Sequence, residues 1–438
     1  EARNPGVNAV VSRLYDEARA AIERGLPEGP FAGVPYLLKD LSALYAGAAT
    51  TFGCALFRDA VADHDSEMVA RLKRAGLVIF GKTNTSELGL STSTEPRLYG
   101  PTRNPWNAAF SAGGSSGGAA AAVASGMLPM AHATDGGGSI RIPASACGLF
   151  GLKPTRARNP SGPDVGEGWN GASAQHAVTR SVRDSAALLD ATSGPDIGDP
   201  YWAPPPQRPF LAEIDADPGR LRIAVTATAW NGKPVDPECV DAVARASSLL
   251  ESLGHEVSEA RPSWDESQRQ EATRLIAAAH TRAALAARAK ALGRAPRPED
   301  VEPPTWLVAE IGREAGAADY ARAITVAHGV GRAVGRFFTR YDILLTPTMC
   351  RPPHRLGVLG PENPDGAAYL DALLGTIAFT SPFNTSGNPA MSMPLHRSRD
   401  GLPIGVQLVA GFGAEATLFR LAAQIERAAA WTGARPAG

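Results

Sequence analysis

Two short blocks rich in glycine and serine hold the residues whose types and spacing could do chemistry. The first reads GGSSGG over residues 113–118, and the second reads DGGGSIRIP over residues 135–143. Three glycines before Ser139 permit backbone torsion angles that other residues avoid, and they allow several N–H groups to converge on one substrate oxygen. An oxyanion hole beside a serine nucleophile requires this arrangement.

A serine nucleophile needs a base, and neither block supplies a histidine. The chain has six lysines against 37 arginines, and Lys39 closes the apolar run FAGVPYLLKD over residues 31–40. Burial among such apolar neighbours disfavours the charged amine, lowers its pKa and lets a lysine act as a base. Asp40 would oppose this effect, but alternation along a strand turns adjacent side chains to opposite faces. Lys39 is therefore the candidate base.

Two other motifs compete for these stretches of the chain. Residues 76–83 satisfy the phosphate-binding pattern G-x-x-x-x-G-K-[ST], but the four intervening residues are strongly apolar and predict a strand whose amides bond within a sheet. Residues 113–117 satisfy the nucleophile-elbow pattern G-x-S-x-G of Ser-His-Asp esterases. That elbow requires a buried strand before the serine and a downstream acid and histidine. The preceding NPWNAAFSA (104–112) does not predict such a strand, so we interpret the first motif as a coincidence and keep the esterase as an alternative.

Further motifs, spread along the chain, resemble the amidase signature family together with the two blocks. They are GVPYLLKD (33–40), GKTNTSE (81–87), TRNPWN (102–107), CGLFGLKPT (147–155) and DGLPIGVQLV (400–409). They follow the family's order and extend the resemblance from about residue 5 to residue 432. Within the family, FAGVPYLLKDL, TRNPWN and PFNTSGNPA (382–390) are most similar to the 6-aminohexanoate-cyclic-dimer hydrolase branch, which adjoins bacterial amidases, aryl acylamidases and urethanases.

The resemblance implies a fold and a reaction. The fold is α/β, with a large mixed β-sheet covered by α-helices on both faces and a single domain over residues 1–438. The reaction is hydrolysis of a C–N bond in an amide, an anilide, a carbamate or a nylon-type oligomer. Ser139 is the nucleophile, Ser115 relays the proton beside an unusual cis peptide bond, and Lys39 is the final base. The resemblance implies no cofactor and no metal.

The resemblance also implies roles for the residues around this triad. The oxyanion hole consists of the N–H groups of Gly136, Gly137, Gly138 and Ser139. Three residues support the loop without reacting: Ser116, Asp135 and Arg141. Many relatives carry Ile or Ala among the three glycines, so this chain has less side-chain volume in the wall that faces the acyl part of the substrate.

Composition and the spacing of apolar residues predict how the chain is organised. Residues 1–195 and 340–438 are expected to form the catalytic core, and 200–340 a more variable helical module on the substrate side. Substrate contacts are expected around 88–94, within 160–175, and in 300–340 and 355–385. Apolar runs predict strands over 31–38, 77–81, 221–226, 342–348, 389–395 and 403–409. Helical spacing predicts helices over 8–28, 66–76, 117–127, 236–254, 265–290 and 417–431, and residues 296–306 are expected to form a loop.

Composition excludes several classes of function. The 43 basic and 44 acidic residues leave a net charge of −1, so the chain lacks the basic surface that nucleic acids or anionic membranes bind. Its four cysteines form neither a disulfide framework nor a metal-binding pattern. No run predicts a spanning helix, and the N-terminal segment does not resemble a signal peptide. We expect a cytoplasmic monomer or homodimer whose only partner is a small amide or carbamate substrate.

A second function from another class is also compatible with the resemblance. The family includes the glutamine-hydrolysing subunit of a tRNA-dependent amidotransferase, which delivers ammonia to a partner chain. The segment 200–340, with its PPPQRPF loop (204–210), does not resemble that branch. Activity of the isolated chain would distinguish a free-standing hydrolase from such a subunit.

Overall fold

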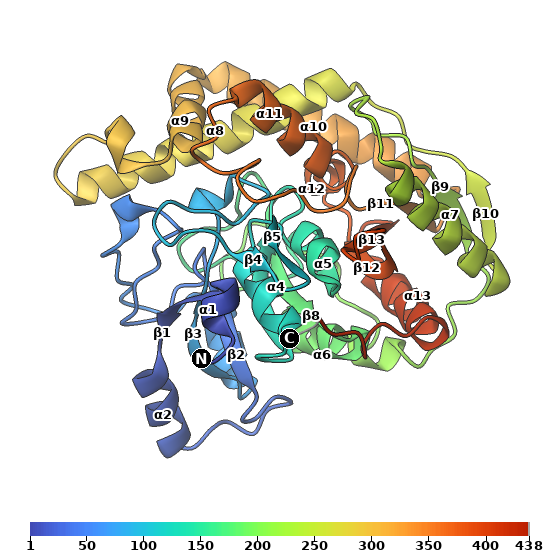
Figure 1. Cartoon of the computed structure of the whole chain (residues 1–438), viewed down its shortest axis with the longest axis horizontal. Helices are drawn as coiled ribbons and strands as arrows, with labels where there is room; N and C mark the ends of the chain where they lie inside the picture. Colours follow the sequence, from blue (N-terminus) through green and yellow to red (C-terminus); the bar gives the residue numbers. More distant parts are fainter. Residues whose placement is uncertain (437–438) are drawn as a thin grey trace.

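An eight-stranded mixed β-sheet forms the centre of the structure (Figure 1). The computed structural model describes residues 1–436. Across the sheet the strands follow the order β10 (Glu256–Glu259), β9 (Arg222–Val225), β11 (Ile343–Pro347), β13 (Pro403–Ala410), β12 (Ala390–Arg397), β7 (Phe150–Lys153), β8 (Ala174–Thr179) and β6 (Met130–Asp135). The first three strands run parallel to one another, and the remaining pairs are antiparallel.

Helices cover both faces of this sheet, as the resemblance implies. On β11, Ile343 and Leu345 pack into one apolar cluster while Leu344 packs into another, because successive side chains of a strand point to opposite faces. The helices on the first face are α6 (Val182–Thr192), α7 (Pro237–Ser252) and α13 (Glu415–Ala428). The helices on the second face are α4 (Gly117–Ala124), α5 (Arg141–Cys147), α10 (Ala317–Phe337) and α12 (Ser381–Ser386). The predicted α/β class is confirmed.

A smaller sheet brings a second strand end beside β6. It has the order β1 (Val10–Arg13), β3 (Val78–Thr83), β2 (Pro35–Lys39), and β2 packs next to β6. The backbone N–H of Lys39 donates to Nδ1 of His132 on β6 over 3.3 Å. The ends of β2 and β6 therefore lie close together, although the sequence separates them widely.

Helix α4, whose side chains are almost all methyl-sized, occupies the middle of the molecule. Every one of its residues is buried. A Cβ placed on Gly118 would lie 2.4 Å from the backbone nitrogen of Asn84, so only glycine allows the helix to approach that segment. The helix begins directly after Ser115 and Ser116, and its position fixes theirs.

Most of the remaining predicted elements are confirmed, with ends shifted by a few residues. The strands are β2, β3, β9, β11, β12 and β13, and the helices are α3 (Glu67–Arg74), α4, α7, α8 (Glu266–Ala291) and α13. Because residues 78–83 form β3, the phosphate-binding pattern there is a coincidence. A two-stranded hairpin of β4 (Arg103–Asn104) and β5 (Asn107–Ser111) precedes the first serine block, and β5 is mostly exposed.

The helix predicted over residues 8–28 is confirmed only in its second half. The chain instead forms α1 (Asn4–Val7), β1 and α2 (Tyr15–Glu23). Residues Val10–Arg13 pair antiparallel with β3, and this sheet pairing outweighs the helical spacing of the apolar residues. Leu14 and Ala18 of the expected apolar stripe are buried but Ile22 is 54% exposed, so the stripe faces the core only in part.

The segment 200–340 contains strands as well as helices. It contributes β9 and β10 to the large sheet, and α7 covers one face of that sheet. Its other helices, α8, α9 (Pro303–Glu314) and α10, lie together with α11 (Gly366–Ile377) along one edge of the molecule (Figure 1). The loop expected over 296–306 is only partly a loop, because Pro303 occupies the first turn of α9, where a missing N–H costs nothing.

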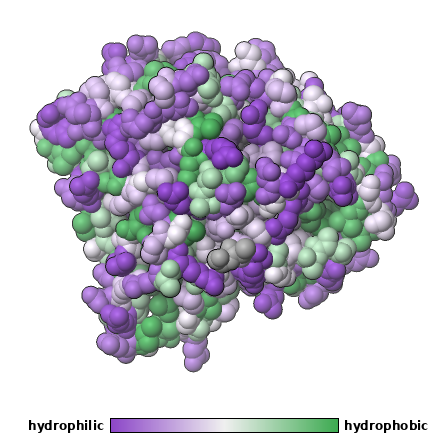
Figure 2. Space-filling view, in the orientation of Figure 1, coloured by the Kyte–Doolittle hydropathy of each residue, from purple (hydrophilic) through white to green (hydrophobic). Residues whose placement is uncertain are grey.

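Hydrophilic and hydrophobic residues are interspersed over the face shown in Figure 2. Among residues 1–436, every helix is either too short or too polar to cross a bilayer.

Candidate active site

A cavity of about 170 Å³ is lined by residues from both serine blocks. It lies where the ends of β2 and β6, the start of α4 and one face of α8 meet. The residues that line it are Leu41, Ser42, Phe52, Leu88, Gly89, Ser115, Thr134, Gly136, Ser139, Gly168, Trp169, Ser173, His280, Thr281 and Ala284. Ser115 and Ser139 are thus brought together, as predicted.

Lys39 lies directly behind Ser115. Its side chain is fully buried, and Nζ is 2.7 Å from Ser115 Oγ and 2.8 Å from Thr134 Oγ1. Burial lowers the pKa of Lys39 well below its ordinary value, and the more distant charge of Asp135 opposes this only in part. The amine is therefore disposed to be neutral and to accept a proton.

Asp40 does not oppose this, because it points away from its neighbour. Its carboxylate accepts hydrogen bonds from Thr51 and lies 4.0 Å from Nζ of Lys82. The prediction that strand alternation separates Lys39 from Asp40 is confirmed.

The two serines of the first block have different surroundings. The peptide bond between Gly114 and Ser115 is cis, and Ser115 faces the cavity. Ser116 instead bonds to the backbone of Thr134, with its hydroxyl 3.2 Å from the carbonyl oxygen and 3.3 Å from the nitrogen. Ser116 therefore ties the start of α4 to β6.

A buried ion pair holds the loop that carries Ser139. Arg141 Nε and Nη2 donate to the two carboxylate oxygens of Asp135 over 2.9 and 2.8 Å, and neither side chain is exposed. Burial alone would raise the pKa of Asp135, but the Arg141 guanidinium beside it, helped by Lys153, holds that pKa well below its usual range. Asn384 completes the support, since it donates to Asp135 over 2.8 Å and accepts from Arg141 over 2.6 Å.

The amides expected to form the oxyanion hole do not all face the cavity. The Gly138 N–H donates to Oδ1 of Asp135 over 2.8 Å, so this donor is already used. Within residues 1–436 no hydrogen-bond acceptor contacts the N–H groups of Gly136, Gly137 or Ser139. Of the four expected donors, three therefore have no acceptor among the described residues, because the carboxylate that supports the loop takes the fourth.

The space beside Gly136 is filled by an aromatic ring. A Cβ on Gly136 would lie 3.1 Å from the ring of Trp169, tighter than ordinary contact. The Trp169 ring thus occupies the space that a side chain at residue 136 would fill.

The rest of the wall corrects the expected substrate contacts. Of the four expected regions, 88–94 and 160–175 contribute, through Leu88 and Trp169 among others. The regions 300–340 and 355–385 line no part of this cavity, and α8 contributes instead, through His280, Thr281 and Ala284. Their spacing places them on one helical face. Sequence reasoning also missed Phe52 and Thr134.

Charge is absent from this lining. Its fifteen residues include no aspartate, glutamate, lysine or arginine, and His280 is the one titratable imidazole among them. Nε2 of His280 lies 3.0 Å from the hydroxyl of Tyr320, not beside a carboxylate. The Ser-His-Asp arrangement of the esterase alternative is therefore not formed here.

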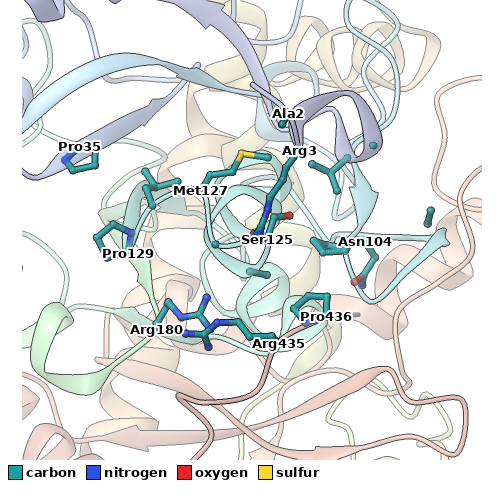
Figure 3. A pocket seen from close by; sticks show the side chains of 17 residues that line it. Ala2, Arg3, Pro35, Asn104, Ser125, Met127, Pro129, Arg180, Arg435 and Pro436 are labelled. Atoms are coloured by element: carbon teal, nitrogen blue, oxygen red, sulfur yellow. The ribbon is translucent and has the colours of Figure 1, made fainter. Parts of the chain in front are cut away.

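A larger hollow of about 980 Å³ lies elsewhere, between the two ends of the described chain (Figure 3). Arg3, Arg180 and Arg435 line it, and none of the predicted catalytic residues does. Arg3 donates to the carbonyl of Ser125 and Arg180 to that of Val123, at the carboxyl end of α4. These arginines stabilise the negative end of that helix.

Comparison with known proteins agrees with this geometry. The family described as Amidase matches residues 1–419. The chain is 41% identical to a 6-aminohexanoate-cyclic-dimer hydrolase of Paenarthrobacter ureafaciens, over 100% of this chain and 90% of that protein. It is 34% identical to an acylamidase of Rhodococcus erythropolis, over 100% of this chain and 91% of that protein.

A solved structure is similar over almost its whole length. The structure of a 6-aminohexanoate cyclic dimer hydrolase complexed with substrate superimposes with a TM-score of 0.94 and 40% identity, covering 99% of this chain and 92% of that one. The chain therefore belongs to the amidase family and is a hydrolase of amide C–N bonds.

Proposed function

We propose that this amidase cleaves uncharged amides and carbamates through an acyl-enzyme on Ser139, with Ser115 and Lys39 moving the proton. The observation that carries the proposal is the 2.7 Å contact between Lys39 Nζ and Ser115 Oγ at the wall of the cavity that also holds Ser139. A neutral lysine can accept the proton that a serine hydroxyl releases.

The reaction has two halves. Ser139 Oγ attacks the carbonyl carbon while its proton passes through Ser115 to Lys39, and the C–N bond then breaks as the same route returns the proton to the leaving nitrogen. In the second half water attacks the acyl-enzyme and gives a proton through Ser115 to Lys39, and the same proton returns to Ser139 Oγ as the acid is released. The N–H groups of Gly136, Gly137 and Ser139 stabilise the oxyanion, and one such donor contributes roughly 10²–10³ in rate.

The uncharged lining supports an uncharged substrate. Phe52, Leu88 and Trp169 offer apolar surface, and no lining side chain would balance a formal charge on a ligand. The cyclic dimer named for one relative is such a compound, and a carbamate presents the same carbonyl carbon bonded to nitrogen. We extend the substrate class to anilides and to nylon-type oligomers for the same reason.

The amidotransferase-subunit alternative receives no support from this cavity. Glutamine carries a charged amino group and a charged carboxylate, and burying them without partners costs several kcal/mol. We expect the chain to act without a protein partner, as a monomer or a homodimer.

Covalent labelling tests the assignment of the nucleophile. A fluorophosphonate is expected to add once per chain, with peptide mapping placing the added mass on Ser139. Ser139→Ala should abolish labelling and turnover of a panel of amides, anilides and carbamates, while its thermal unfolding stays near that of the parent. A label on Ser115 would contradict the assignment.

A further inference from the structure

His280 is a polar residue in the cavity wall that the proposed reaction does not use. It lies on α8, and its Nε2 is 3.0 Å from the hydroxyl of Tyr320 on α10. Tyr320 in turn packs against the cluster of Ala272, Ile276 and Ala323, as does Trp169 of the cavity wall. The imidazole is thus hydrogen-bonded to a tyrosine hydroxyl whose ring is itself packed against an apolar cluster.

The proton between these two groups has a preferred position. A phenol is a better hydrogen-bond donor than a neutral imidazole, so the Tyr320 hydroxyl donates to Nε2 and the imidazole proton resides on Nδ1. Burial lowers the pKa of His280, which keeps the ring neutral at neutral pH. Within residues 1–436 nothing accepts a hydrogen bond from Nδ1.

Three hydroxyls of the cavity wall already have partners. Thr281 donates to the carbonyl of Ala277 over 2.8 Å, and Ser115 and Thr134 both contact Lys39. His280 lines the cavity from a different element than the serines, and among residues 1–436 its Nδ1–H has no protein acceptor, so it can donate to a molecule there.

We propose that His280 determines substrate preference by donating a hydrogen bond from Nδ1 to a second carbonyl of the substrate, with Tyr320 as the positioning residue. The favoured class is then uncharged and bifunctional: a diamide or dicarbamate whose two carbonyls are joined by a short apolar spacer. The apolar wall of Phe52 and Trp169 encloses the spacer. This inference rests on the proposed function, since it assigns the part of the substrate that does not react.

Matched substrates test the role of the second carbonyl. One pair consists of the 4-nitroanilides of adipic acid monoamide and of 6-methylheptanoic acid, in which a branched methyl end replaces the primary amide. In the second pair, the primary amide or the branched methyl end is attached instead to the amine part of the scissile amide. The readout is the ratio of kcat/KM within each pair, normalised to the fraction of chain that a fluorophosphonate labels at Ser139.

His280→Ala is expected to lower this ratio roughly threefold to tenfold in at least one pair, the range of a single hydrogen bond. His280→Asn should recover part of the preference, because its side-chain nitrogen takes the place of Nδ1. Tyr320→Phe removes only the hydroxyl and should lower the ratio in the same direction, because it frees the imidazole proton to move to Nε2. His328→Ala changes an exposed histidine of α10 outside the cavity and should leave both ratios unchanged.

The outcomes distinguish the proposed function from the role of His280. If the parent is neither labelled at Ser139 nor active, the proposed function fails and this inference fails with it. A second outcome is normal labelling and turnover while His280→Ala leaves both ratios unchanged, even if it slows the two substrates of a pair equally. In that case the proposed function stands and the role of His280 is overturned.

Discussion

Nζ of Lys39 lies 2.7 Å from Oγ of Ser115, and both residues are buried. An ammonium group can only donate hydrogen bonds, so the lysine can take the serine's proton only as a neutral amine. The carboxylate of Asp135, which would favour the charged form, is already paired with Arg141. The proposed reaction therefore depends on the depressed pKa of one lysine.

The first prediction concerns the dependence of kcat/KM on pH. Because burial lowers the pKa of Lys39, its base form is present above that lowered pKa and is lost as the pH falls through it. We expect kcat/KM to rise with pH along one ionisation, well below the ~10.4 of free lysine. A pH–rate profile with a substrate that does not itself titrate measures this. A profile that begins to rise only near pH ~10 would contradict it.

Substitution of the same lysine gives a second measurement. Lys39→Ala should lower kcat/KM by about 10²–10⁴, and Lys39→Arg should not restore it, because arginine does not deprotonate. Lys290→Ala, at an exposed position of α8, is the control and should change neither rate nor profile. An arginine variant of near-parental rate would mean that Lys39 serves as a fixed charge.

The next prediction compares two adjacent glycines of the loop. Gly138 has a φ of 137°, and a Cβ there would lie 2.5 Å from Ile142 Cδ1 and from Thr380 Oγ1, whereas a Cβ on Gly137 would meet no atom within 4 Å. Gly138→Ala should lower the free energy of unfolding by roughly 1–3 kcal/mol. Gly137→Ala should change it by less than about 0.5 kcal/mol. Urea unfolding of both variants provides the comparison, and equal stabilities would contradict the loop geometry.

The buried ion pair supports a prediction about stability. Arg141→Leu leaves the carboxylate of Asp135 buried without its main partner, so unfolding should become about 3–5 kcal/mol easier at pH 7. Arg19→Ala breaks an exposed pair with Asp16, and its effect should stay below about 1 kcal/mol. Chemical denaturation measures both variants.

The same pair has a pH signature. The pKa of Asp135 is depressed in the folded chain, so its contribution to stability is present above the unfolded value of ~3.9 and is lost as the pH falls through the folded value. The difference between the parent and Arg141→Leu should therefore shrink on acidification, because the unpaired carboxyl of the variant protonates and no longer carries a buried charge. A constant difference between pH 7 and pH 4 would contradict this.

The cavity wall leads to a prediction about substrate binding. Trp169→Ala removes an aromatic ring beside Gly136 and should raise KM about tenfold, with a smaller change in kcat and with labelling of Ser139 retained. Leu307→Ala is the control on α9, where the side chain is 65% exposed and lies outside the cavity. An equal effect of the two substitutions would restore the expectation that residues 300–340 contact the substrate.

Sequence alone predicted those residues of the candidate site that belong to unusual local sequence patterns. The triple glycine before Ser139 and the lysine that ends an apolar run are such patterns, and so is the set of small residues in α4. Thr134 was missed because a threonine inside a strand is ordinary, and its contact with Lys39 arises only from the packing of β2 against β6. Asn384 was missed as a support of Asp135 because the contact joins residues far apart in the chain.

The errors have the same physical origin. Helical spacing over residues 8–28 describes the apolar residues correctly but does not reveal that β3 offers a free edge for pairing. The composition of the sequence does change near residue 200, yet the strands β9 and β10 that follow still join the large sheet. Both depend on partners distant in sequence, which local patterns do not encode.

The placement of His280, Thr281 and Ala284 on a single face of α8 has a consequence for evolution. The residues proposed to break the bond lie at the end of β2, just before α4 and in the loop between β6 and α5, whereas these three project from a helix that holds none of them. Point mutations on that face can alter which compound fits while leaving the serines and the lysine in place. A population exposed to a new synthetic amide could thus adapt through a few codons of one helix.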